Sequence, residues 1–348
     1  MAAIRVFVPT FRRASLLARA LASLRAQSFG DWIGYVHNDA PDDPAPGRLV
    51  ASFGDTRLRL IAHERNLGPV ATFNRGFQES AGQEPFFAVL EDDNTWDPRF
   101  LETLHTALLR HPDASLAWCN QRIWFEGADG VWTDSGASVH PEPADDGSNV
   151  PPADAAQRVE WGDYRQATGA LTANGAMLLR RNGPETLVTP DIPFTGMEAF
   201  RERLLPSPFL FLPHSLATYS RTRTTARAAD GHAWGAVQTL LLGSFVRHAA
   251  MDAHDRKAFW RHLRSQRPPP TNLALHAAWS CEGCGALLAD ANPGDWLRYA
   301  KTWLGRPAGA WAGVRARARH PDWWAASNDA TARRFSESSV RSGRKPAI

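Results

Sequence analysis

The chain has 348 residues, of which 43% are hydrophobic and 22% charged, a composition typical of a soluble globular protein with one large domain or two ordinary ones. Its formal net charge of +3 excludes a dense basic coat and argues against nucleic-acid binding as the main activity. No stretch approaches the ~18 consecutive apolar residues of a membrane span, and no signal peptide is visible at the N-terminus. We therefore expect a cytoplasmic protein.

Strands and helices alternate through the N-terminal third of the chain. Short apolar runs predict strands, and apolar residues spaced three and four apart predict helices. The expected strands cover residues 4–8, 32–37, 58–62, 86–90 and 115–120, and the expected helices cover residues 14–27, 49–53, 70–80 and 100–111. This alternation predicts an α/β fold with a Rossmann-like, mostly parallel sheet flanked by helices.

The second half of the chain changes character twice. Residues 126–160 are rich in Gly, Pro, Asp and Ser and predict a long loop, and strands at 172–180 and 209–219 follow around a short helix at 197–205. Past Gly231 the periodicity is helical throughout. We therefore place a first domain at residues 1–228, a helical C-terminal domain at 229–336 and a disordered tail at 337–348.

Polar residues follow three of the predicted strands, as Pro9-Thr10, Asn38-Asp39 and Glu91-Asp92-Asp93. Parallel sheets bind ligands at the C-terminal ends of their strands, so these residues are expected to lie together at one edge. Three adjacent acids repel each other, and a divalent cation is the natural group to hold them. The alternative is an acidic turn whose side chains cap the following helix. Dinucleotide and ATP-hydrolysing functions lose support because no Gly-x-Gly-x-x-Gly and no P-loop follow the first strand.

Three motifs in the N-terminal region carry a resemblance to a known family. They are Val8 to Arg13, Asn66-Leu67-Gly68-Pro69 followed by Asn74-Arg75-Gly76, and Leu90 to Asn94 followed by Trp96 and Pro98. Their order and spacing resemble glycosyltransferase family 2, the inverting nucleotide-sugar transferases with a GT-A fold, over residues 3–225. The resemblance implies a hexosyltransferase-type enzyme that moves a sugar from a nucleotide-diphosphate sugar, most simply a UDP-sugar, to a hydroxyl acceptor.

The resemblance also implies roles for individual residues. Asp93 is the expected direct ligand of Mg²⁺ or Mn²⁺, with Glu91, one carbon longer than the family's acid, as a further ligand. His214 is either another ligand or a structural histidine beside Pro213. The residues expected near the nucleotide or its diphosphate are Pro9, Thr10, Arg12, Asp39, Arg65, Asn66, Glu91, Asp92, Arg221 and Arg223.

An inverting transfer also needs a base that deprotonates the incoming hydroxyl. The family's acid opens a helix at this point of the chain, which selects Glu198, with Asp191 as the next candidate. Two other functions stay open. A non-catalytic nucleotide-sugar-binding protein of the same fold is compatible with Glu91 and Asn38, which depart from the family pattern. A sugar nucleotidyltransferase is disfavoured, because the loop after the first strand contains no glycine.

The helical tail finds no counterpart in the family. Residues 303–324 mix tryptophan and arginine, a composition suited to an anionic membrane surface. Peripheral contact with the inner face of the membrane, homodimerisation and a solvated tail are all compatible with it. The sequence fixes neither the donor sugar and base nor the acceptor, for which polysaccharide, glycolipid and natural-product glycoside synthesis are the expected settings.

Overall fold

The computed structural model describes residues 2–79, 84–143, 156–181, 187–223 and 231–342. The chain forms two compact units. Unit 1 comprises residues 1–159, 172–188 and 206–226, and unit 2 comprises residues 160–171, 189–205 and 227–348. The last part of unit 2 thus begins next to the domain boundary expected at residue 228, while two earlier segments of the chain also belong to unit 2.

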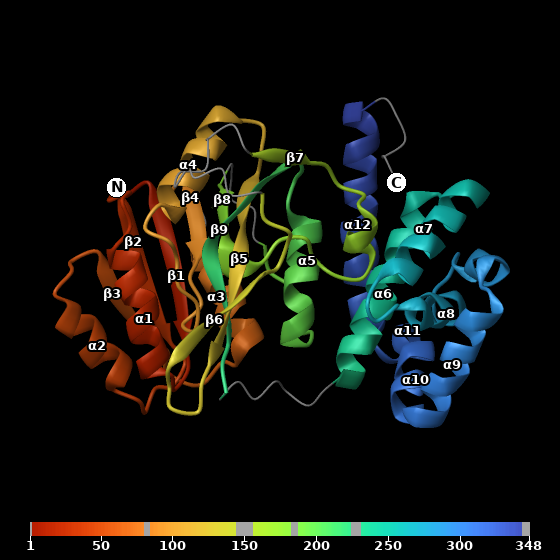
Figure 1. The fold of residues 1–348 in the computed structure, drawn as a ribbon, viewed down its shortest axis with the longest axis horizontal. Helices are drawn as coiled ribbons and strands as arrows, with labels where there is room; N and C mark the ends of the chain where they lie inside the picture. The colour runs from red at the N-terminus through yellow and green to blue at the C-terminus, as the bar shows by residue number, and fades with distance from the viewer. Residues whose placement is uncertain (1, 80–83, 144–155, 182–186, 224–230, 343–348) are drawn as a thin grey trace. The chain divides into compact units, whose positions relative to one another are not determined.

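Unit 1 is built on a single mixed sheet (Figure 1). Within the described residues, nine strands form it in the order β3-β2-β1-β4-β8-β5-β9-β7, with β6 beside β5. The strands are β1 (Ile4–Thr10), β2 (Trp32–Asn38), β3 (Leu58–Ala62), β4 (Phe86–Val89), β5 (Leu116–Glu126), β6 (Trp132–Ser138), β7 (Gln157–Val159), β8 (Met177–Arg180) and β9 (Phe209–Arg221).

Strand directions determine where the polar strand ends meet. Strands β3, β2, β1 and β4 pair in parallel, and so do β5 and β9. Strand β8 is antiparallel to both of its neighbours, β4 and β5, so β4 and β5 point the same way. The carboxyl ends of six strands therefore lie at one edge, which confirms the predicted mostly parallel sheet.

Helices cover both faces of this sheet. Alternate residues of β1 point to opposite faces: Val6 and Val8 pack in the core with helices α1 (Ala14–Arg25), α2 (Ala45–Phe53) and α4 (Phe100–Arg110). On the other face, Phe7 meets Phe73 of α3 (Pro69–Glu79), with ring centroids 5.5 Å apart. Helix α3 approaches so closely that a Cβ on Gly76 would lie 2.4 Å from the Phe7 ring, so this position requires glycine.

Two sequence predictions about unit 1 are wrong in detail. The region predicted as a loop, residues 126–160, contains β6 and β7, although residues 144–155 lie outside the described part. Strand β6 escapes prediction because it is largely exposed and lacks an apolar alternation. Strand β8 starts at Met177 rather than at residue 172, since residues 174–176 form a 3₁₀ turn.

Unit 2 is helical. Its helices are α5 (Met197–Leu204), α6 (Gly231–Ala249), α7 (Ala253–Ser265), α8 (Thr271–Ser280), α9 (Pro293–Gly305), α10 (Pro307–Val314), α11 (Ala316–Arg319) and α12 (Pro321–Ser342). Trp161 and Ala167 pack in its core with Phe245 and Trp260, which explains why residues 160–171 join this unit. The helical periodicity expected past Gly231 is interrupted after Ser280, where α8 ends and a turn with Gly283 at φ 83° follows. Helix α12 continues to Ser342, into the segment predicted as disordered, and residues 343–348 lie outside the described part.

Candidate active site at the sheet edge

The acids after β4 are held by the end of β1 and the start of α1. Asp92 is 6% exposed and accepts a hydrogen bond from the Thr10 hydroxyl at 2.8 Å. Arg13 Nη1 donates to Asp92 Oδ1 at 3.2 Å and to Asp93 Oδ2 at 3.1 Å. The structure thus brings together all three predicted strand ends, since the Asp39 backbone N–H also donates to the Thr10 carbonyl at 3.0 Å and Asn38 pairs with Thr10. Arg13, which the sequence did not single out, bridges the two carboxylates.

Burial disfavours the ionised forms of the two aspartates. Burial, followed by repulsion from Asp93, raises the pKa of Asp92 to about 6, against the opposing effects of Arg13 and Thr10. Burial also raises the pKa of Asp93, again opposed by Arg13. An additional cation beside these carboxylates would lower both pKa values, which is the electrostatic condition that a metal or a cationic ligand site meets.

The raised pKa of Asp92 predicts a pH-dependent stability. The folded pKa of Asp92 lies above its ordinary value of 3.8, so its contribution to stability is present below about pH 4 and is lost as the pH rises to about 6. We expect the free energy of unfolding of the wild type, relative to that of Asp92→Asn, to fall by up to about 3 kcal/mol across this window. Urea denaturation in EDTA at a series of pH values measures this difference. Asp42→Asn, at an exposed acid, is the control, and a pH-independent difference between the wild type and Asp92→Asn would contradict the prediction.

Glu91 is positioned by its neighbour Asn94. The Asn94 side chain donates to Glu91 Oε2 at 2.8 Å, and its own oxygen accepts from the Ser220 backbone at 2.9 Å. A Cβ on Gly175 would lie 2.8 Å from Glu91 Oε2, so the glycine makes room for this carboxylate. Asn94 was not predicted as a site residue. Its place directly after the acids is the signal that points to it.

Arg12 pairs with an acid outside the cluster after β4, and its predicted role at the nucleotide stays a prediction. Its backbone adopts a left-handed conformation with φ of 54°, and its guanidinium pairs with the exposed Asp42 at 2.6 Å. The following residue, Arg13, reaches the carboxylates instead. Pro9 is buried within β1, opposite His37 of β2.

A second cation approaches Asp93 from α1. Arg19 stacks over the Trp132 ring, with its guanidinium carbon 3.7 Å from the ring centroid. Burial lowers the pKa of Arg19, while Glu126 and Asp93 oppose this effect. Its Nη1 is buried and has no hydrogen-bond partner within the described part of the chain. The sequence did not single out Arg19, because the α1 periodicity alone does not show that this position turns toward the acids.

Asp39 organises the loop between β3 and α3. It is 4% exposed, and each of its carboxylate oxygens accepts two hydrogen bonds. Oδ1 accepts from His63 Nδ1 at 2.9 Å and from the Leu67 backbone N–H at 2.7 Å. Oδ2 accepts from Asn66 Nδ2 at 3.0 Å and from the Gly68 backbone N–H at 3.0 Å. His63 in turn contacts His37. Burial lowers the pKa of His37 to about 3. Asp39 and Asn66 therefore hold the turn that precedes α3, and their predicted contacts with the donor base stay predictions.

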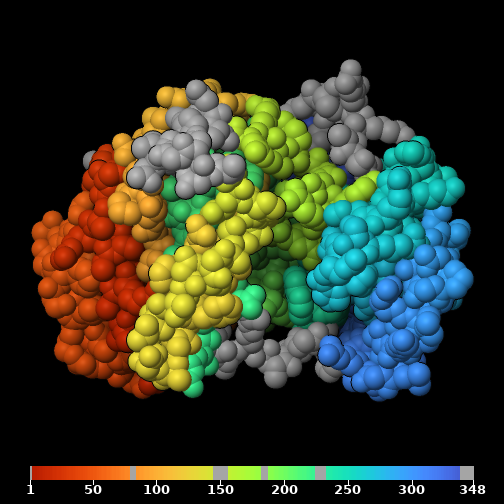
Figure 2. Space-filling view, in the orientation of Figure 1, coloured from red at the N-terminus to blue at the C-terminus, as the bar shows by residue number. Residues whose placement is uncertain are grey.

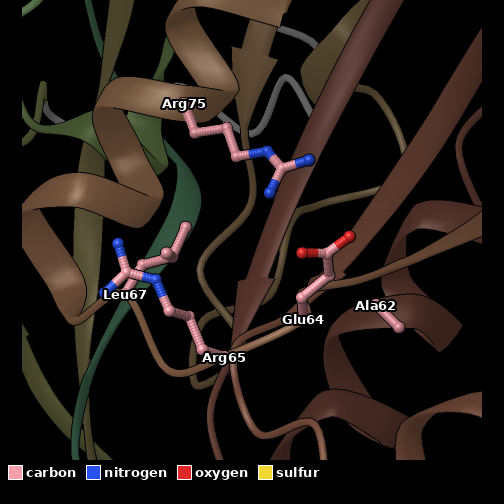
Figure 3. A pocket seen from close by; sticks show the side chains of 5 residues that line it. All are labelled: Ala62, Glu64, Arg65, Leu67 and Arg75. Atoms are coloured by element: carbon pink, nitrogen blue, oxygen red, sulfur yellow. The ribbon is translucent and has the colours of Figure 1, made fainter.

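A pocket of about 370 Å³ opens beside this turn (Figure 3). It is lined by Ala62, Glu64, Arg65, Leu67 and Arg75. Figure 3 shows Arg75 extending from α3 toward the Glu64 side of the pocket, while Arg65 and Leu67 extend from the loop after β3. The predicted nucleotide residue Arg65 thus lines an open, polar hollow next to the residues that Asp39 holds.

Arg221 and Arg223 lie at the carboxyl end of β9, on the edge that carries the acids. The Arg221 guanidinium lies over the Phe125 ring at 5.5 Å, and the Arg223 backbone donates to Glu126 at 2.9 Å. Both side chains are exposed. The neighbouring Ser220 is linked through Asn94 to Glu91, so the acids and these arginines share one connected edge.

The predicted three-residue metal site is not assembled. Among the described residues, no group of three or more His, Cys, Asp or Glu side chains is placed to hold a metal ion. His214 sits where the pairing of β9 with β5 shifts register, beside Asn120, whose side chain donates to the Pro213 carbonyl at 3.2 Å. Glu91 and Asp93 follow β4, whereas His214 lies within β9, and the three side chains do not form such a group.

The two candidate bases belong to unit 2. Glu198 lies in the first turn of α5, where its carboxylate opposes the effect of burial on Arg201, whose pKa falls to about 9. Asp191 is exposed, and its backbone carbonyl accepts from Trp323 Nε1 at 2.7 Å.

Comparison with known proteins identifies the N-terminal segment. Residues 5–149, which include the acids, Arg13 and the Asp39 turn, match the glycosyl transferase family 2 description. This segment is similar to glycosyl transferase family 2. The resemblance predicted from the three motifs is therefore confirmed for the part of the chain that carries them.

Curated relatives match about a quarter to a third of the chain. The chain is 29% identical over 122 residues to the succinoglycan biosynthesis protein ExoW of Rhizobium meliloti, covering 34% of this chain and 38% of that protein. It is 36% identical over 91 residues to ExoO of the same organism, covering 26% of this chain and 25% of that protein. The chain thus spans well under half the length of the curated relatives it matches.

A solved structure shares the fold over nearly the whole chain. S. aureus TarS, in complex with UDP-GlcNAc, matches with a TM-score of 0.52 at 13% identity, covering 98% of this chain and 92% of the other. The likeness shows the fold alone, a sheet flanked by helices and followed by C-terminal helices. None of the described helices is both long and apolar enough to cross a membrane.

Proposed function

We propose that the chain is a metal-dependent, inverting glycosyltransferase that moves a sugar from a nucleotide-diphosphate sugar to a hydroxyl acceptor. The observation that carries the proposal is the cluster of Asp92 and Asp93 at the end of β4, held by Thr10 and Arg13 inside a family 2 segment. UDP is the proposed nucleotide, because the TarS structure of similar fold contains UDP-GlcNAc. The names of ExoW and ExoO favour polysaccharide synthesis as the setting.

The carboxylates suit Mg²⁺ or Mn²⁺. Both ions prefer oxygen ligands and often take only one or two carboxylates from the protein, with phosphate oxygens completing the shell. Asp93 and Glu91 would hold the ion, and the raised pKa values of Asp92 and Asp93 mark a place where added positive charge is favourable. When bound, the ion would supply positive charge for the departing diphosphate.

Side chains of this chain are assigned to donor binding and to removal of the acceptor proton. Arg13 keeps Asp92 and Asp93 oriented at the edge. Arg221 and Arg223 stand at the same edge, and we assign them to the diphosphate, whose oxygens guanidinium groups bind well. Arg65 in its pocket, with Pro9 and Asn66, is assigned to the nucleoside. Glu198 is the proposed base that takes the proton from the acceptor hydroxyl, and Asp191 is the alternative.

A nucleotide screen tests this proposal. We expect UDP with Mn²⁺ to raise the thermal midpoint by about 5 °C when its concentration is about 100 times Kd, and GDP, TDP and CDP to raise it less. The shift should disappear in EDTA. Binding must be accompanied by turnover of a UDP-sugar, because binding without turnover would indicate a non-catalytic protein. Pyrophosphate release from a sugar phosphate and a nucleoside triphosphate would indicate a nucleotidyltransferase.

A further inference from the structure

Helix α9 of unit 2 exposes large apolar side chains on one face. Trp296 is 38% exposed, Leu297 58% and Leu304 86%. Leu304 follows the other two by seven and eight residues, which is two helical turns, so the three side chains share a face. Apolar side chains gathered in this way mark an interaction surface rather than scattered exposure.

A cationic pocket borders this apolar face. It has a volume of about 370 Å³ and is lined by Asn272, Arg298, Lys301, Thr302, Gly305 and Arg306. The lining contains three cations, one hydroxyl and one amide, and no acid. Arg298 is steadied by Thr271 at 3.1 Å and Asp295 at 3.7 Å. Lys301 and Arg306 are exposed, and within the described ranges neither forms an ion pair.

Helix α10 continues the same composition. Trp311 is 48% exposed, packs edge-on against Trp303 with ring centroids 5.3 Å apart, and carries the Arg315 guanidinium 5.0 Å above its ring. Tryptophan with arginine or lysine is the pairing that settles at the boundary between lipid headgroups and acyl chains. Residues around 300, drawn as blue spheres, are at the surface of the face shown in Figure 2.

We propose that this α9–α10 surface binds an anionic phospholipid bilayer. The cationic pocket takes a lipid phosphate, whose several oxygens match guanidinium, ammonium and hydroxyl donors. Trp296, Leu297 and Leu304 enter the headgroup boundary beside it. Charge selects lipid over a second copy of the chain, because a symmetric dimer through this face would place the unpaired Lys301 and Arg306 of both copies against each other.

Vesicle flotation at physiological salt tests the proposal, using the whole chain with phosphatidylcholine alone or with one third phosphatidylglycerol. We expect the wild type to float only with the anionic vesicles. Lys301→Gln/Arg306→Gln should lower the partition coefficient by about 25-fold, since each cation near an anionic surface contributes about fivefold. Leu297→Ser/Leu304→Ser should lower it tenfold or more, because two exposed leucines lose their apolar contact.

The matched control is Lys257→Gln/Arg261→Gln, which removes the same charge from exposed positions of α7 in the same unit. It should change binding less than twofold, and thermal midpoints should show that all variants fold. Equal flotation with neutral vesicles, or equal loss in the control and the Lys301/Arg306 variant, would overturn the proposal. Inorganic phosphate that displaces the protein from vesicles would reassign the pocket to free phosphate. A dimer in sedimentation equilibrium that the leucine variant dissociates would reassign the face to a second copy.

Discussion

Replacing Asp93 with Asn is expected to lower kcat for sugar transfer by about 10³-fold in saturating Mn²⁺, without unfolding the protein. Asp93 provides one of the two carboxylates that Arg13 bridges at the end of β4, and burial already raises its pKa. Asn keeps the size of the side chain but removes the negative charge. The variant should therefore lose its share of cation binding while being relieved of the repulsion with Asp92.

The measurement is initial-rate kinetics of a UDP-sugar over a Mn²⁺ titration, accompanied by the thermal midpoint. The control is Asp42→Asn, which removes an exposed acid outside the cluster after β4, where it pairs with Arg12. This control should stay within twofold of the wild type. Wild-type turnover by Asp93→Asn in the presence of Mn²⁺ would remove the basis for the proposed function.

The sheet was predictable because its central strands are buried on both faces. Every residue of β1 is buried, and so are all four of β4, so β4 stands out as a continuous apolar run and β1 as a largely apolar run that only Arg5 interrupts before Thr10. Strand β6 gave no such signal, because its hydrogen bonds to β5 rather than burial hold it. The extent of unit 2 could not be predicted from local sequence patterns either, since Trp161 joins a core formed by helices far later in the chain.

In the candidate site, too, some contacts could be predicted from the sequence and others could not. The contact between Thr10 and Asp92 could be predicted, because the alternation of strands and helices along the chain implies parallel strands whose carboxyl ends lie at one edge. Which arginine reaches the acids does not follow, because Arg12 and Arg13 are neighbours of identical type and a positive φ at Arg12 separates their directions. The hydrogen bonds of Asp39 to residues 66–68 were also hidden, since they join loops that local patterns treat separately.

The second large effect is expected at Glu198. Glu198→Gln should lower kcat by about 10³-fold, because a positioned general base contributes about 10² to 10⁴-fold, while leaving the affinity for UDP and Mn²⁺ unchanged. Glutamine preserves the length of the side chain and removes only the ability to accept a proton. Isothermal titration with UDP and initial rates over a range of acceptor concentrations separate these two quantities.

A purely structural role for Glu198 predicts something different. Glu198 offsets part of the burial cost of Arg201 in unit 2, so its loss lowers the thermal midpoint whether or not it acts as a base. The pH profile separates the two roles: a base gives the wild type an acidic limb in kcat that disappears in Glu198→Gln, whereas a structural charge lowers activity equally at every pH. Asp191→Asn serves as the matched comparison, because Asp191 is exposed and its described contact is made by its backbone. If Asp191→Asn loses the acidic limb while Glu198→Gln keeps it, the base is Asp191.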